Sequence, residues 1–158
     1  MSSFPEMLER FKHAVEQCDV EAFKALFTED AVYEDQVYGA FKGHAELERM
    51  LRDVFHEDAT GFLWEFDEPL CDGDLGYVHY RFSLKPSHPK AAGGRALLEG
   101  CARFTLRDGR FSSYREWGNV AGTLHQSGVP DNVVMRFVKR QADALREKPE
   151  MAGHVKGK

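Results

Sequence analysis

The sequence has few cysteines, no long apolar run and no excess of positive charge. Its three cysteines, Cys18, Cys71 and Cys101, are widely spaced, and this odd number without a CxxC pair argues against a disulfide framework or a zinc-binding thiol cluster. No apolar run approaches the ~20 residues that span a bilayer, and the formal net charge of -5 argues against a nucleic-acid binder. We therefore expect a cytoplasmic protein with reduced thiols and with no membrane or nucleic-acid partner.

Motifs for metals and cofactors are missing as well. The 7 histidines include no HxxxH or HxH pair, so we predict no metal. The glycine-rich stretch 92–94 lacks the Lys-Ser/Thr sequence of a phosphate-binding loop, and we predict no cofactor. The segment 1–6 lacks the charged and then apolar layout of a secretion signal, and we expect none.

The residues that are present are typical of one globular domain. Of the 158 residues, 42% are hydrophobic and 12 are phenylalanine, which is enough to bury a sizeable core. Helical periodicity predicts helices over 4–18, 20–27 and 44–55. Ser3 and Glu6 form a capping-box sequence at the start of the first of these helices.

Alternating apolar residues predict strands in the middle of the chain. They cover residues 31–35, 62–66, 76–84, 96–106 and 111–120, with a short partner over 37–41. Asp-Gly pairs supply the turns of two hairpins. Helices followed by a long meander indicate an α+β fold, in which the helices cover one face of a strongly curved antiparallel sheet. Such a cone has a mouth where a small molecule can bind.

A further helix is predicted at the C-terminal end of the chain. It begins near Pro130 and ends at Pro149. Its helical spacing predicts that the following apolar side chains are buried: Val133, Val134, Phe137, Val138 and Leu145.

Four short motifs follow the predicted elements in order. They are CDVEAF at 18–23, LFTEDAVYED at 26–35, GAFKG at 39–43, and FTLRDGRF at 104–111 leading into YREW. Together they resemble the nuclear transport factor 2-like superfamily, which includes SnoaL-like polyketide cyclases, ketosteroid isomerases, scytalone dehydratases and limonene epoxide hydrolases. The resemblance implies a cone domain over 1–125 with a small-molecule pocket, a C-terminal helix over 126–148 that packs on it, and a flexible tail over 149–158.

Only some of the functional residues of the ketosteroid isomerases have a counterpart in this sequence. Asp35 falls where the resemblance implies a carboxylate that shuttles a proton. Phe11, however, falls where those enzymes have a tyrosine that binds the developing enolate oxygen. Their second oxyanion donor would lie near Cys101 or Ala102, and neither is an acid. Because a base without oxyanion donors lacks the largest electrostatic contribution to enolisation, steroid isomerisation is disfavoured.

Glu116 is the second position to which the resemblance assigns a catalytic role. It matches the acid of the last strand that serves as base in the epoxide hydrolases and SnoaL-like cyclases, although here it is one methylene longer. The epoxide hydrolases also have an Arg and an Asp two residues apart on a middle strand. His79 and Arg81 occupy that neighbourhood and supply a cation but no second acid.

Strand alternation assigns these side chains to faces. It places Tyr33 and Asp35 on one side of the strand, and the resemblance implies that this side faces the cone. There, burial would raise the pKa of Asp35. The alternative is that Asp35 caps the turn before Gly39 and is exposed to water. In the last strand it places Ser112, Tyr114, Glu116 and Gly118 on one face, and Phe111, Arg115 and Trp117 on the other. An alternative for Glu116 is a buried ion pair with Arg81, Arg103 or His79.

Two hypotheses for the function remain open. In the first, the chain is a cofactor-independent lyase, isomerase or cyclase acting on a small apolar or aromatic molecule. Its catalytic residues would be Asp35, Glu116 and His79, and its ligand pocket would include Phe11, Tyr33, Tyr114, Arg81 and Trp64. In the second, it is a non-catalytic ligand-binding or dimerisation module of the same fold. We expect a homodimer through the outer sheet face, because an exposed Trp117 is costly on a monomer.

Overall fold

The computed structural model describes residues 2–57, 59–91 and 94–157. The stretch 92–93 of the predicted glycine-rich loop lies outside the described residues. The helical elements are α1 (Phe4–Gln17), α2 (Val20–Ala25), α3 (Gly43–Arg49), η1 (Met50–Phe55), α4 (Val120–Gln126), α5 (Asp131–Glu147), η2 (Pro149–Met151) and α6 (Ala152–Val155). The strands are β1 (Phe27–Asp35), β2 (Gly39–Lys42), β3 (Ala59–Asp72), β4 (Leu75–Pro86), β5 (Ala96–Arg107) and β6 (Arg110–Gly118).

The predicted start of the first helix is confirmed. The Ser3 hydroxyl accepts a hydrogen bond from the Glu6 N–H at 3.4 Å, and the Ser3 N–H donates to the Glu6 carboxylate at 2.7 Å. This capping box satisfies backbone donors that have no partner within the helix. The helix ends at Cys18, which has a left-handed φ of 54°, and Asp19 then caps α2 through the N–H of Ala22.

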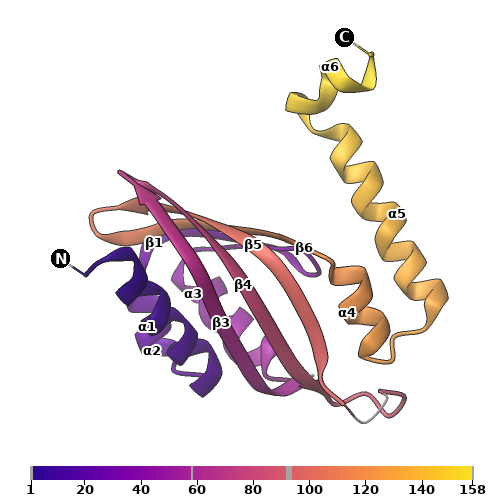
Figure 1. Cartoon of the computed structure of the whole chain (residues 1–158), viewed down its shortest axis with the longest axis horizontal. Helices are drawn as coiled ribbons and strands as arrows, with labels where there is room; N and C mark the ends of the chain where they lie inside the picture. The colour runs from indigo at the N-terminus through magenta and orange to yellow at the C-terminus, as the bar shows by residue number, and fades with distance from the viewer. Residues whose placement is uncertain (1, 58, 92–93, 158) are drawn as a thin grey trace.

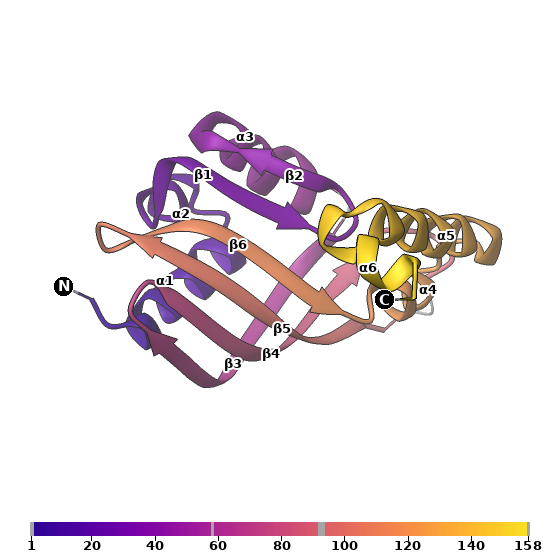
Figure 2. The same cartoon turned by 90° about the horizontal axis from the view of Figure 1, so that it is seen from above.

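The sheet has six strands in the order β2-β1-β6-β5-β4-β3 (Figure 2). All neighbouring pairs are antiparallel except β1 and β6, which run parallel. The sheet is therefore mixed, and it is antiparallel as expected at every pair except this one. The last strand of the meander returns beside the first strand of the chain, and alternation within either strand carries no information on which edges meet.

Helices cover one face of the curved sheet, as expected for a cone. Figure 1 shows α1, α2 and α3 on the same side of the long strands β3 to β6. Between the helices and the sheet lies an aromatic core whose fully buried side chains include Phe11, Phe23, Phe27, Phe104 and Phe111. At the free edge of the sheet, the Trp64 N–H donates to Glu16 of α1 at 2.9 Å, which satisfies a backbone group that has no strand partner.

Phe111 lies on the opposite face from the predicted one, because β6 contains a bulge. Leu106 pairs with Phe111 but Thr105 pairs with Ser113, so Ser112 is an extra residue in β6. This insertion reverses the alternation, because side chains have a period of two along a strand. Phe111 and Tyr114 consequently both point into the core and are fully buried.

The C-terminal region differs from the prediction in two ways. A short helix, α4, follows the sheet where none was predicted, and Asn119 caps it through the N–H of Gly122. The long helix α5 has the predicted bounds, but Val133, Val138 and Leu145 are 37%, 39% and 48% exposed, so the expected burial is wrong. Figure 1 shows the reason, because α5 projects away from the cone.

Two hydrogen bonds connect α5 to the turn between β1 and β2. The Gln141 amide donates to the Gln36 carbonyl at 2.7 Å, and the Arg140 guanidinium donates to the Val37 carbonyl at 3.3 Å. Both acceptors lie in the turn between β1 and β2, so α5 contacts the sheet at that turn. Within the described part of the chain, no helix is both long enough and apolar enough to cross a bilayer.

Candidate functional site

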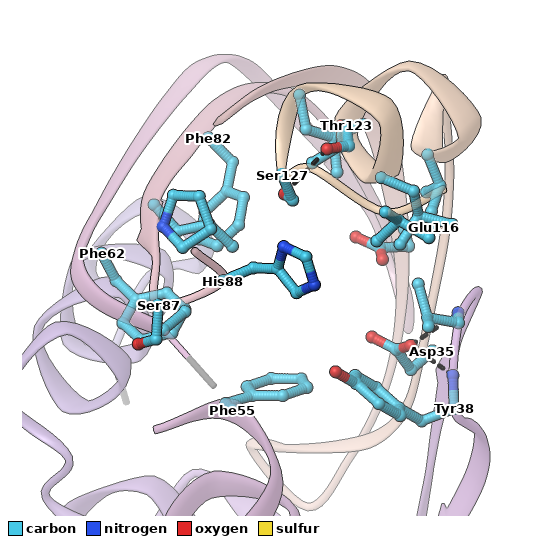
Figure 3. A pocket seen from close by; sticks show the side chains of 18 of the residues that line it. Asp35, Tyr38, Phe55, Phe62, Phe82, Ser87, His88, Glu116, Thr123 and Ser127 are labelled. Atoms are coloured by element: carbon cyan, nitrogen blue, oxygen red, sulfur yellow. Dashed lines mark hydrogen bonds between the residues drawn. The ribbon is translucent and has the colours of Figure 1, made fainter. Parts of the chain in front are cut away.

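A cavity of about 540 Å³ opens between the inner sheet face, η1, the loop after β4 and helix α4. Its volume is within the range of ligand pockets, roughly 300–1,000 Å³. The walls are largely apolar, and they carry these aromatic side chains: Tyr33, Tyr38, Phe55, Phe62, Trp64 and Phe82. Two carboxyl groups, from Asp35 and Glu116, also line the cavity and face it together in Figure 3.

Glu116 is the buried acid of this cavity. Its side chain lies on β6, and the residue is only 8% exposed. The hydroxyl groups of Tyr80 and Tyr114 both donate to its Oε2, at 2.9 and 2.6 Å, so neither phenol engages Oε1. Burial, together with the nearby charge of Asp35, raises the pKa of Glu116 to about 7, although both phenol hydrogen bonds oppose the shift. At neutral pH this side chain can therefore either donate or accept a proton.

The phenols that hold Glu116 are themselves rigid and protonated. Tyr114 stacks on Tyr33 with ring centroids 4.2 Å apart. Burial, reinforced by the charge of Glu116, raises the pKa of Tyr114 and of Tyr80 above the ordinary value. Both therefore remain hydrogen-bond donors over the whole physiological range. Phe11 lies beneath this layer, 5.8 Å from the Tyr114 ring, in the core and not on the cavity wall.

Two glycines make room for the Tyr80 hydroxyl. Gly100 and Gly118 face each other in the β5–β6 ladder. A Cβ atom on Gly100 would lie 2.8 Å from the Tyr80 hydroxyl and 2.4 Å from the Trp117 carbonyl, and one on Gly118 would lie 3.3 Å from that hydroxyl. The absence of side chains at these positions lets Tyr80 reach Glu116 across the intervening strand.

Asp35 both caps a turn and lines the cavity. Its Oδ1 accepts hydrogen bonds from the N–H groups of Val37 and Tyr38, at 2.7 and 2.8 Å. Burial raises the pKa of Asp35, and these two backbone hydrogen bonds oppose that shift. The alternation expected for β1 is confirmed, because Tyr33 is buried beside it while Glu34 is exposed and pairs with Arg115 on the outer face at 3.5 Å.

His79 and Arg81 lie outside the cavity, in contrast to the expectation. In β4 the side chain of Tyr80 points inward, so its two neighbours point to the outer face. His79 contacts Glu99 at 3.0 Å, and Arg81 contacts Asp67 at 2.8 Å. No ion pair with Arg81, Arg103 or His79 forms at Glu116, which the two phenols bind instead.

Sequence reasoning missed two residues of the site. Tyr80, which donates to Glu116, is not among the predicted site residues. His88 is not among them either, but Figure 3 shows its ring projecting into the cavity from the side opposite Asp35 and Glu116. Its Nδ1 accepts from the Lys90 N–H at 3.2 Å, which orients the ring. The flanking Pro86 and Pro89 were the available signal, because prolines stiffen a loop that presents a side chain.

Two further hydroxyl groups on the wall are already engaged. The Thr123 hydroxyl donates to the Leu97 carbonyl, and the Ser127 hydroxyl donates to the Thr123 carbonyl, each at 2.8 Å. Within the described residues, no group of three or more His, Cys, Asp or Glu side chains is arranged to hold a metal ion. Among the described lining residues, the carboxyl and imidazole groups are those of Asp35, Glu116 and His88.

Comparison with known proteins identifies relatives of this architecture. The model of the family described as SnoaL-like domain matches residues 8–114. No curated protein matches the sequence. A hypothetical protein with a ketosteroid isomerase-like fold from Catenulispora acidiphila DSM 44928, solved in complex with trimethylamine, superposes with a TM-score of 0.71 at 18% identity, over 82% of this chain and 98% of that chain.

Two further solved structures have the same fold. An LEH-like epoxide hydrolase of M. tuberculosis superposes with a TM-score of 0.63 at 22% identity, over 82% of this chain and 93% of that chain. A putative SnoaL-like polyketide cyclase from Shewanella denitrificans OS-217 superposes with a TM-score of 0.64 at 14% identity, over 77% of this chain and 94% of that chain. At such identities these structures are evidence for the fold alone.

Proposed function

Because the chain belongs to the family of SnoaL-like domains, we propose that it is a cofactor-independent enzyme that moves a proton on a small, largely apolar substrate. The reaction class is that of a lyase, isomerase or cyclase with a carboxylate general base. The observation that carries the proposal is the buried Glu116, whose pKa is about 7 in a cavity of ligand size. The trimethylamine in the Catenulispora acidiphila structure supports small-molecule binding in this fold.

Glu116 is the proposed base. A general base works best when its pKa is close to the operating pH, because it is then sufficiently ionised and still basic. Tyr80 and Tyr114 hold Oε2, which directs the proposed proton transfer to Oε1. Asp35 contributes the second negative charge, and its proximity increases the basicity of Glu116.

The proposal can be tested without knowing the natural substrate. The probe is 5-nitrobenzisoxazole, from which a base removes the ring C–H proton. The electron pair of that bond forms the nitrile as the N–O bond breaks, and the oxygen keeps the N–O pair, which gives a coloured cyanonitrophenolate as the single product. We expect the full chain to accelerate this reaction with a rate that rises with pH through about 7, the pKa of Glu116. Glu116→Gln should lower the rate by about 100- to 10,000-fold, the usual contribution of a general base.

A matched control separates the base from surface acids. Glu99→Gln changes the same residue type on the outer face of the neighbouring strand, where Glu99 contacts His79, and it should leave the rate unchanged. If Glu116→Gln is as active as the wild type, the enzyme proposal is wrong and a ligand-binding module remains. Circular dichroism checks that each variant is folded.

We also propose that two copies associate through the outer sheet face. Trp117 is 44% exposed there, and the Arg115 guanidinium lies 5.0 Å from its ring centre. Tyr77 and Leu97 add exposed apolar area on the same face. Sedimentation should give a dimer for the wild type and a monomer for Trp117→Glu, and a monomeric wild type would contradict the proposal.

A further inference from the structure

The two carboxyl groups of the cavity have no positive partner. Glu116 is bound by two neutral phenols, and the hydrogen bonds of Asp35 come from two backbone N–H groups. Among the described residues, no lysine or arginine lines the cavity, and no ion pair includes either acid. A desolvated negative charge without a counter-ion is costly. The cavity is therefore electrostatically complementary to a cation.

The remaining walls indicate what kind of cation fits. The cavity holds about 540 Å³ and is mainly apolar, which suits an organic body far larger than a metal ion. Figure 3 shows the rings of Phe62 and Phe82 on the side opposite the carboxyl groups, with Phe55 between the two sides. Aromatic faces attract ammonium groups through their quadrupole, most strongly where water is excluded.

We propose that the cavity selects a small hydrophobic amine, bound as its ammonium ion beside Asp35 and Glu116 with its apolar body against the aromatic rings. This inference rests on the proposed function, because it names the substrate class of the same site. Two carboxylates repel an anionic ligand, and a neutral ligand leaves their charge unpaired. Selectivity for the amine therefore arises from the acids, and affinity for its body arises from the apolar walls.

Amine binding is coupled to the proton on Glu116. The groups that face this carboxyl are Asp35 and Tyr33 from β1, Tyr80 from β4, Tyr114 from β6, and His88 from the loop after β4. An ammonium ion replaces the proton as the positive charge in the cavity. Because the pKa of Glu116 is about 7, binding at pH 6 must release that proton, whereas binding at pH 8 does not. Amine affinity therefore increases with pH across this interval.

The test is titration calorimetry on the full chain with three probes of one shape: benzylamine, benzyl alcohol and benzoate. We expect the amine to bind at least ~10-fold tighter than the alcohol at pH 8, since a desolvated cation–π contact alone has this magnitude. Benzoate should not bind detectably. The amine should bind more weakly at pH 6, with release of protons to the buffer.

Variants identify the source of the selectivity. Asp35→Asn should reduce amine affinity and thereby lower the ratio of amine affinity to alcohol affinity. Asp67→Asn is the matched control, because Asp67 pairs with Arg81 on the outer face. His88→Gln removes the one described lining side chain that can itself become positive, and the amine preference should persist without it.

The outcomes separate this inference from the proposed function. Equal affinities for amine and alcohol, a preference for benzoate, or no amine binding would each overturn the amine class. If any of these occurs while the benzisoxazole rate still depends on Glu116, the proposed general base is retained. A rate that is independent of Glu116, with amine selectivity intact, would overturn the catalytic role alone.

Discussion

In the described part of the chain, acidic side chains have a cationic partner on the outer face of the sheet and none on the inner face. On the outer face, Asp67 pairs with Arg81 and Glu99 contacts His79. On the inner face, Glu116 and Asp35 are near each other with no cation among the described lining residues. Exposed ion pairs contribute little to stability, whereas unpaired buried carboxyls have raised pKa values. The site is therefore distinguished by acids that lack counter-ions, and not by the number of acids.

The largest expected difference between the faces concerns packing. Phe11 is fully buried beneath the site, with its ring 5.1 Å from Trp64 and 5.8 Å from Tyr114. Phe11→Ala should lower the free energy of unfolding by about 3–5 kcal/mol, because it leaves a cavity in a packed core. Leu63→Ala, at an outer-face residue that is 54% exposed, should change it by less than about 0.5 kcal/mol. Urea denaturation measures both, and similar losses would contradict the comparison.

A second difference concerns the pH dependence of stability. The ordinary pKa of Glu116 is 4.5, and in the folded protein it is about 7. Between these values the folded chain retains a proton that the unfolded chain loses, so the contribution of Glu116 to stability falls as pH rises. Glu116→Gln removes this effect and should stabilise the protein at pH 8 relative to pH 4 by up to about 3 kcal/mol.

The control for this prediction is Glu99→Gln on the outer face. Thermal unfolding between pH 4 and pH 8 should give the same pH profile for this variant as for the wild type. If Glu116→Gln also leaves the pH profile of stability unchanged, Glu116 is ionised at its ordinary pKa. The conclusion that the inner-face carboxyls lack a counter-ion is then wrong.

The third difference concerns a glycine of β5 beside Tyr80 and a glycine of the loop before β5. Gly100→Ala would place a methyl group 2.4 Å from the Trp117 carbonyl and 2.8 Å from the Tyr80 hydroxyl, and should cost about 1–3 kcal/mol of stability. It should also displace Tyr80 from Glu116, which weakens an opposing hydrogen bond and raises the pKa of Glu116 further. Gly94→Ala is the control, since no atom lies within 4 Å of its added Cβ. Denaturation and NMR titration together detect both effects.

The smallest expected effect is a change in the pKa of Glu116 without a change in the fold. Asp35→Asn removes the neighbouring charge that raises the pKa of Glu116, so this pKa should fall while the fold is unchanged. Asp67→Asn, on the outer face, should leave it unaltered. Carbon-13 NMR of labelled glutamate carboxyls measures the value directly, and an identical pKa in Asp35→Asn would show that burial is the sole cause.

Much of the fold was predictable because it depends on neighbours in the chain. The Ser3–Glu6 capping box and the bounds of α5 are set by contacts within a few residues, and all were predicted. In β1, the same local alternation correctly placed Tyr33 and Glu34 on opposite faces. In β6 it failed for Phe111, because a single extra residue, Ser112, reverses the faces without any local signature.

The candidate site was predictable only in part. Asp35 and Glu116 line one cavity, whereas His79 and Arg81, predicted beside them, lie on the opposite face. The inward residue of that stretch is Tyr80, whose phenol reaches Glu116 because Gly100 leaves space for it. Such contacts join residues that are distant in sequence, and periodicity within one strand cannot reveal them.

The sequence by itself determined the order of the elements other than α4, several of their ends and the identity of the acids, because these follow from local hydrogen bonding and side-chain periodicity. Only the tertiary structure decided that β1 lies parallel to β6, that α5 projects away from the cone, and that two carboxyl groups share a cavity without a cation. The pairing of β1 with β6 and the shared cavity depend on contacts between residues that are distant in the sequence. Burial by this tertiary packing, together with the charge of Asp35, and not any short motif, raises the pKa of Glu116 to about 7.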